Sequence, residues 1–125
     1  MTRHLSPAER LASAEKDLLL ENLADQSSWD RYLVEQAAFH YGTRVDEFSA
    51  NDLRDVLPEM AHGFLGAVIN SLRTAGVIEH TGRVVPSTLA NTHGHRISVW
   101  RLSVKGLVIA EQRRRARRAP TEAAA

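Results

Sequence analysis

The side chains best able to bind an anion lie in the second half of the chain, and most of them are arginines. One run carries five of them with no acidic residue among them: Arg113, Arg114, Arg115, Arg117 and Arg118. Guanidinium groups form bidentate hydrogen bonds with phosphate and with the edge of guanine. Five such groups can displace counterions from a nucleic acid backbone whatever its base sequence. RNA, an acidic protein surface or simple solvation of a chain end would suit this run as well.

A second group of hydrogen-bonding side chains lies between positions 83 and 96. It contains hydroxyls, an amide, imidazoles and two guanidinium groups: Arg83, Ser87, Thr88, Asn91, His93, His95 and Arg96. Gly94 allows this segment to turn. Side chains of these types on a loop suit contacts to phosphate and to the minor groove of DNA. The alternative is an ordinary solvated loop.

A third group follows from the spacing of apolar residues over positions 59–75. Those residues recur at three- and four-residue intervals: Met60, Phe64, Leu65, Val68, Ile69 and Leu72. This spacing predicts a helix with one buried face. The opposite face would carry His62, Gly63, Gly66, Asn70 and Arg73.

On that exposed face, Asn70 and Arg73 are able to form bidentate contacts with base edges. Two glycines inside a helix would each cost about 1 kcal/mol relative to alanine. That cost indicates a flat surface that another molecule approaches closely, either a phosphate backbone or a helix of another protein.

Other chemistries find little support in the sequence. His93 and His95 flank Gly94, and His80 lies nearby, but this set offers no cysteine and no clear third ligand for a metal. The chain has no phosphate-binding loop, dinucleotide-binding glycine pattern, nucleophile elbow or zinc-protease motif. We therefore expect no metal site, no cofactor and no enzymatic activity.

Composition and charge bound the class of protein. The chain has 125 residues, 43% of them hydrophobic, which is enough for one domain with a modest core. It has no cysteine, so disulfides and cysteine-based zinc sites are excluded. Residues 1–60 hold six basic and twelve acidic residues, whereas residues 61–125 hold ten basic and three acidic ones. This asymmetry fits a surface that meets a polyanion on one side.

The location of the protein is also constrained by the sequence. No apolar run approaches 18 residues, so we expect no membrane span. The first residues lack the apolar core of a signal peptide. We therefore expect a cytoplasmic protein.

Capping residues predict the helices of the first half. Ser6 followed by Pro7 and Glu9 is typical of a helix start, and that helix should run to about residue 25. It would pack on the core or on a second subunit. The Ser27-Ser28 pair then predicts the cap of a second helix, over residues 29–41, that ends at Gly42. A very short strand is expected at residues 47–48.

The middle of the chain predicts a helix pair and a hairpin. Ser49, with Asp52 three residues later, predicts the start of a helix over 50–57. Pro58 interrupts this helix, and Gly76 should end the next one. The expected strands are Val77–Val85 and Arg96–Leu102.

The end of the chain is expected to be simpler. Residues 103–110 should form a short helix or an extended arm, and residues 120–125 should be disordered. The predicted core is built from residues at helical or strand spacing: Trp29, Leu33, Leu53, Phe64, Val68, Leu72, Ile78, Val99 and Leu102.

The order helix, turn, helix, strand, polar loop, strand over residues 48–102 resembles the winged-helix variant of the helix-turn-helix family. The segments 81–87 and 93–102 are similar to the wing of small bacterial and phage proteins of this kind. The resemblance covers about half of the chain. It implies an α+β, mainly helical fold: a winged helix-turn-helix with an extra N-terminal helix and a basic C-terminal tail. The domains would be an N-terminal helix at 1–26, the winged helix at 27–110 and a partly disordered Arg-rich tail at 111–125.

The resemblance implies that the second helix of the pair and the wing contact duplex DNA. The leading hypothesis is thus a DNA-binding protein, either a transcriptional regulator or a replication accessory protein. In the alternative, the module is an adaptor that binds another protein, such as a host factor, through helix 59–75 or helix 6–25. A homodimer is compatible with both hypotheses.

Overall fold

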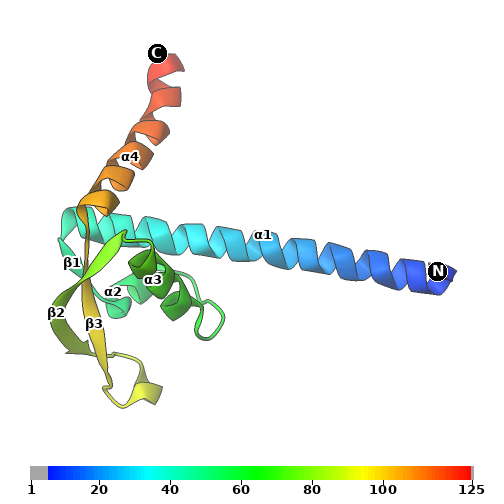
Figure 1. The fold of residues 1–125 in the computed structure, drawn as a ribbon, viewed down its shortest axis with the longest axis horizontal. Helices are drawn as coiled ribbons and strands as arrows, with labels where there is room; N and C mark the ends of the chain where they lie inside the picture. Colours follow the sequence, from blue (N-terminus) through cyan, green and yellow to red (C-terminus); the bar gives the residue numbers. More distant parts are fainter. Residues whose placement is uncertain (1–5, 125) are drawn as a thin grey trace. The chain divides into compact units, whose positions relative to one another are not determined.

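The computed structural model describes residues 6–124, apart from the side chains of residues 19, 21–23 and 119–124. The fold is α+β and mainly helical. Its elements follow in the order α1 (Pro7–Arg44), β1 (Glu47–Phe48), α2 (Ala50–Val56), α3 (Phe64–Thr74), β2 (Ile78–Pro86), the 3₁₀ helix η1 (Ala90–Thr92), β3 (Arg96–Leu102) and α4 (Val104–Ala124) (Figure 1). The chain divides into two compact units after Tyr32, and the sheet lies in the second.

α1 is one continuous helix where two had been predicted. It starts as expected, because the Glu9 N–H donates to Ser6 Oγ at 3.2 Å. Ser27 and Ser28 lie inside the helix instead of capping a new one. Serine is only mildly unfavourable in a helix interior, and no proline or glycine lies between this pair and Gly42 to break the helix.

The prediction that Gly42 ends a helix was wrong. This residue lies in the last turn of α1, where a Cβ would approach the side chain of Leu102 to 2.4 Å. A glycine is needed there because the helix packs closely against β3, and not because the helix stops.

The three strands form an antiparallel sheet in the order β1-β3-β2. Phe48 pairs with Trp100, and Ile78 pairs with Leu102. The short strand predicted at 47–48 and the hairpin predicted after Gly76 are therefore confirmed. The register shifts between His80 and Val84, around Gly82, which has a φ of +89°. The connection between β2 and β3, residues 87–95, is called the hairpin loop below.

The helix over 50–57 is confirmed, because the Ser49 N–H donates to Asp52 Oδ2 at 2.8 Å at the start of α2. The start predicted for the next helix was wrong. α3 begins at Phe64, five residues later than predicted, and Gly63 is its N-cap with a left-handed φ of +80°. Residues 57–63 thus form a turn.

The end of α3 agrees with the sequence. Gly76 adopts a φ of +76°, its N–H donates to the Arg73 carbonyl at 3.0 Å, and the Val77 N–H donates to the Leu72 carbonyl at 3.0 Å. These two bonds satisfy the last carbonyls of the helix and turn the chain into β2.

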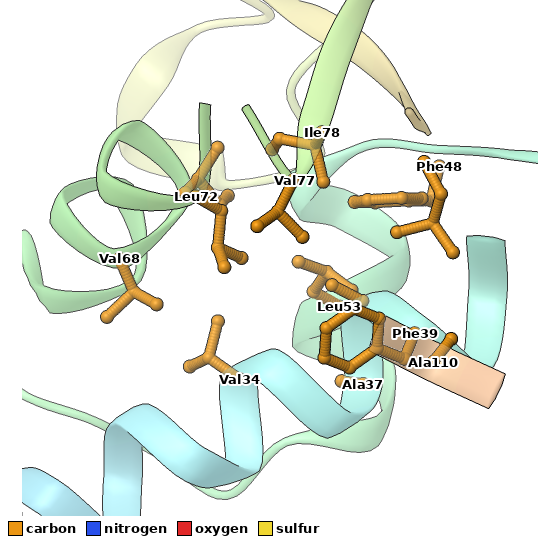
Figure 2. Packing of buried hydrophobic residues seen from close by; sticks show 13 residues of the cluster. Val34, Ala37, Phe39, Phe48, Leu53, Val68, Leu72, Val77, Ile78 and Ala110 are labelled. Carbon is orange, nitrogen blue, oxygen red and sulfur yellow. The ribbon is translucent and has the colours of Figure 1, made fainter. Parts of the chain in front are cut away.

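The core forms where the second part of α1 meets α2, α3 and the sheet. Val34, Ala37, Leu53, Val68 and Leu72 converge there (Figure 2). Of the predicted core, six residues are buried, namely Leu53, Val68, Leu72, Ile78, Val99 and Leu102, whereas Leu33 and Phe64 are partly buried. The prediction for Trp29 was wrong, because its side chain is 56% exposed. The sequence pattern missed Val34 and Phe48, which are fully buried.

α4 extends through the segment that was expected to be a polar tail. Gly106 lets its first turn meet the sheet, since a Cβ there would lie 2.1 Å from the Val77 carbonyl oxygen. Ala110, one turn later, is buried in the core. The helix includes residues 120–124, where disorder had been predicted, and Ala125 lies outside the described residues. Over the described part of the chain, none of the helices is apolar enough over a sufficient length to cross a membrane.

Candidate nucleic-acid interface

One side of α3 is open to solvent and polar at its C-terminal end. Gly66, Ala67, Asn70 and Arg73 are exposed, and these four residues are called the α3 face. Val68, Ile69 and Leu72 are buried on the opposite side. The Arg73 guanidinium donates to Asn70 Oδ1 at 3.1 Å, so the two polar side chains lie together. The predicted division of this helix into an inner and an outer side is confirmed for residues 64–74.

His62 and Gly63 lie in the turn before α3, not on the helix. Both are exposed. The left-handed conformation of Gly63 accounts for a glycine at this position. Of these two glycines, only Gly66 lies inside α3. A Cβ at Gly66 would meet open space, because among the described residues no atom beyond the neighbouring helix backbone lies within 4 Å of it.

The hairpin loop is more ordered than a solvated loop need be. η1 gives it one helical turn, in which Thr92 Oγ1 donates to the Leu89 carbonyl at 2.6 Å. His93 follows with a φ of +52°. The side chains of Asn91, His93, His95 and Arg96 are exposed at and beside this turn. They are therefore available to a ligand.

Ser87 and Arg83 are already engaged within the protein. Ser87 is buried: its N–H donates to the His95 carbonyl at 2.7 Å, and its Oγ accepts from the Leu89 N–H at 3.3 Å. Arg83 forms a 2.5 Å ion pair with Glu47, so its guanidinium points across the sheet toward β1. Ser87 therefore closes the hairpin loop, and because it is buried it is not part of an exposed contact surface.

Asn51 connects α2 to the hairpin loop, a contact that no local sequence pattern indicates. Its Nδ2 donates to the Pro86 carbonyl at 2.9 Å. Its Oδ1 accepts from the Thr88 N–H at 3.0 Å and from Thr88 Oγ1 at 3.1 Å. Arg54 donates to the same oxygen. The loop is therefore fastened to the helix pair by a side chain more than 30 residues away along the chain.

An apolar groove of about 580 Å³ lies between α2, the turn 57–63 and α3. It is called the α2–α3 groove. Leu57, Met60 and Leu65 line it, and Leu89 reaches it from the hairpin loop. Gly66 borders it, so the groove adjoins the α3 face.

The arginine run is a helical segment with several internal partners. Arg113 donates to Glu35 at 2.6 Å and to Gln36 Oε1 at 3.3 Å, and its guanidinium lies 4.8 Å from the centroid of the Phe39 ring. Only 30% of its side chain is exposed. Arg113 therefore holds α4 against α1, and we remove it from the set of residues expected to contact a ligand.

Glu111 pairs with the next two arginines of the run. Arg114 donates to its two carboxylate oxygens at 3.0 and 2.7 Å, and Arg115 donates at 3.1 Å. The Arg114 hydrogen bond, followed by that of Arg115, lowers the pKa of Glu111 to about 2. Glu111 lies two residues before the run, so its position in the sequence is a visible signal of this pairing. Arg117 and Arg118, further along, are exposed.

The histidines considered as metal ligands have other environments. His80 Nδ1 accepts from the Gly82 N–H at 2.7 Å, and its ring packs edge-on against Trp100 at 5.3 Å. In the residues that the structure describes, no three or more histidine, cysteine or acidic side chains gather as a metal site would require.

The comparisons with known proteins add no family to this picture. Neither the protein-family models, nor the curated proteins, nor the solved structures give a significant match to this chain.

Proposed function

We propose that this protein binds duplex DNA as a winged helix. α3 would enter the major groove, and the hairpin loop would act as the wing on the adjacent backbone. The observation that carries the proposal is the fastening of the hairpin loop to α2 by Asn51, next to a helix whose outer face ends in Asn70 and Arg73. This arrangement gives a rigid surface with two groups of donors, as recognition of a duplex requires.

The two groups of donors would serve different purposes. Asn70 and Arg73 have the side-chain geometry for bidentate contacts with adenine and guanine. His93, His95 and Arg96 are exposed donors on the hairpin loop and its flank, suited to phosphates and to the minor groove. Gly66 and Ala67 carry no bulk, which would let the helix backbone approach the groove closely.

A second candidate function is an adaptor that binds a protein, and a specific observation favours it. The α2–α3 groove is apolar and adjoins the α3 face. Exposed apolar groups beside small residues are typical of protein-binding surfaces. In the first unit Leu11, Leu18 and Trp29 are each more than half exposed, which gives a partner or a second copy another apolar surface to cover.

The test is binding of the full chain to random duplex DNA, followed by fluorescence anisotropy at several salt concentrations. We expect binding that weakens steeply with salt, and tighter binding to duplexes selected from a random pool. Gly66→Glu should abolish binding, because it puts bulk and negative charge at the centre of the α3 face.

Val104→Glu is the matched control, since it adds the same side chain at a position that is 80% exposed and outside the proposed surface. No salt-dependent binding of the wild type, even at low salt, would reject the DNA proposal. Loss of a protein partner from Gly66→Glu, with no DNA binding by the wild type, would establish the adaptor.

A further inference from the structure

A second groove, separate from the α3 face, lies between the end of α1 and the middle of α4. It has a volume of about 520 Å³ and is formed by residues 36–44 and 107–117, all within the second unit. It is called the α1–α4 groove. Phe39 and Ala110, both buried, form its apolar floor. Cationic side chains surround that floor.

The charges of this groove do not cancel. Among the side chains that the structure describes, one acid, Glu111, and four arginines line it: Arg44, Arg113, Arg114 and Arg117. Arg113 is matched by Glu35, and Arg114 by Glu111.

Arg44 and Arg117 form no ion pair or hydrogen bond with any side chain that the structure describes. Two positive charges, one from each helix, are thus left facing a shared space. His40 lines the same groove and adds a further hydrogen-bonding ring.

The two helices are held firmly in this arrangement. The Arg113 side chain bridges them through Glu35, Gln36 and the Phe39 ring. At the start of α4, Gly106 packs directly against the Val77 carbonyl. Arg44 and Arg117 are therefore carried by two helices that pack against each other, which reduces the ordering cost of binding a ligand between them.

The electrostatic environment favours negative charge. Glu111 stays ionised at pH values well below the usual range for a carboxyl group, because Arg114 and then Arg115 lower its pKa to about 2. Glu111 is itself matched by Arg114 and Arg115, so the unmatched positive charge of the groove stays with Arg44 and Arg117. Guanidinium donors match the oxygens of a phosphate group in pairs, which suits this anion to a site between two arginines.

We propose that the α1–α4 groove binds phosphate groups of a nucleic acid backbone between Arg44 and Arg117. That the ligand is a nucleic acid rests on the proposed function. The site itself goes beyond that function, because it lies outside the α3 face and the hairpin loop. It also differs from a flexible basic tail, because Arg44 is 73 positions before Arg117 and only the fold brings them to one groove.

The experiment measures the salt dependence of random-duplex binding for the full chain and for a double variant, Arg44→Ala with Arg117→Ala. A matched double variant, Arg10→Ala with Lys16→Ala, has the same net charge and removes two exposed cations of the first unit that also have no side-chain partner among the described residues. We expect the groove variant to reduce the slope of log K against log salt by about 1.8, from about 0.9 for each phosphate contact. The matched variant should change it far less. Circular dichroism would verify that both remain folded.

A second arm titrates tripolyphosphate into the labelled full chain and follows backbone amide NMR signals. Signals of residues 36–44 and 107–117 should shift in the wild type and not in the groove variant. Equal slopes for the two double variants, in a wild type that binds DNA, would overturn the backbone proposal while leaving the proposed function intact.

If the wild type binds no duplex but tripolyphosphate shifts the groove signals, the proposed function fails and the groove's phosphate chemistry stands, with a free phosphorylated ligand as its source. No shift in either region together with no DNA binding would overturn both proposals.

Discussion

Asn51 and Thr88 lie 37 positions apart, yet the Thr88 N–H and hydroxyl both donate to the Asn51 side-chain oxygen, at 3.0 and 3.1 Å. The same asparagine donates to the Pro86 carbonyl. The hairpin loop therefore follows any movement of α2. A surface made of α3 and this loop behaves as one piece only as long as these bonds are kept.

The first prediction tests this coupling. Asn51→Ala should increase hydrogen exchange of residues 87–95 and weaken DNA binding at least several-fold. It should lower the free energy of unfolding by only about 1 kcal/mol, because the lost bonds are exposed. Asn91→Ala, in the same loop but without these bonds, is the control for hydrogen exchange. Unchanged exchange in Asn51→Ala would show that the loop is ordered by η1 alone.

The second prediction separates base contacts from phosphate contacts. Asn70→Ala and Arg73→Ala should each narrow the difference in binding free energy between a selected duplex and random duplex, by about 1–3 kcal/mol. Arg96→Ala should weaken binding to both duplexes by the same factor, because phosphate contacts carry no direct sequence information. Competition titrations with the two duplexes measure this difference. If Asn70→Ala and Arg73→Ala also weaken binding to both duplexes by the same factor, α3 makes no base-specific contacts.

The third prediction concerns Arg113, which we assign to the fold. Arg113→Ala should lower the free energy of unfolding by about 1–2 kcal/mol, since it removes the pair with Glu35 and the contact over Phe39. Arg117→Ala should leave stability unchanged, because this side chain is exposed. Urea unfolding measures both. Removing residues 113–118 together would mix these two effects, so single substitutions are needed.

The fourth prediction uses two glycines in opposite surroundings. Gly66→Ala should raise the free energy of unfolding by about 0.5–1 kcal/mol, because open space surrounds the position and alanine favours the helix. Gly106→Ala should lower it by about 1–3 kcal/mol or more, since its Cβ would collide with the Val77 carbonyl. Thermal and urea unfolding check both signs. A neutral Gly106→Ala would mean that α4 can shift away from the sheet.

The fifth prediction follows from the pKa of Glu111. Its carboxyl should titrate with a pKa near 2 in the folded chain, against an ordinary value of 4.5. A group whose pKa is lower in the folded state than in the unfolded state stabilises the fold at pH values above its ordinary pKa. This contribution is lost as the pH falls from about 4.5 toward 2. Arg114→Ala should move the titration upward. Carboxyl carbon NMR measures the pKa of Glu111 directly. An unchanged pKa in Arg114→Ala would show that Arg115 or other groups keep Glu111 ionised.

Several features of this fold were determined by residues close together in sequence. Ser49 and Asp52 start α2, and Gly76 ends α3, because capping and turn geometry involve only a few neighbouring residues. The spacing of apolar residues placed the buried side of α3 opposite Asn70 and Arg73 for the same reason. The hairpin was predicted because strands and turns have local signatures.

Other features depended on contacts that no local pattern contains. Whether Ser27 and Ser28 cap a helix or continue one depends on a small energetic balance that local propensity does not decide. Gly63 was placed on a helix because apolar spacing says little about the exact boundary. The roles of Asn51 and Arg113 were hidden because their partners, Thr88 and Glu35, lie 37 and 78 positions away. The sequence alone therefore determined the helix pair, the hairpin and the polar side of α3, whereas only tertiary packing decided which polar residues face solvent and which hold the fold together.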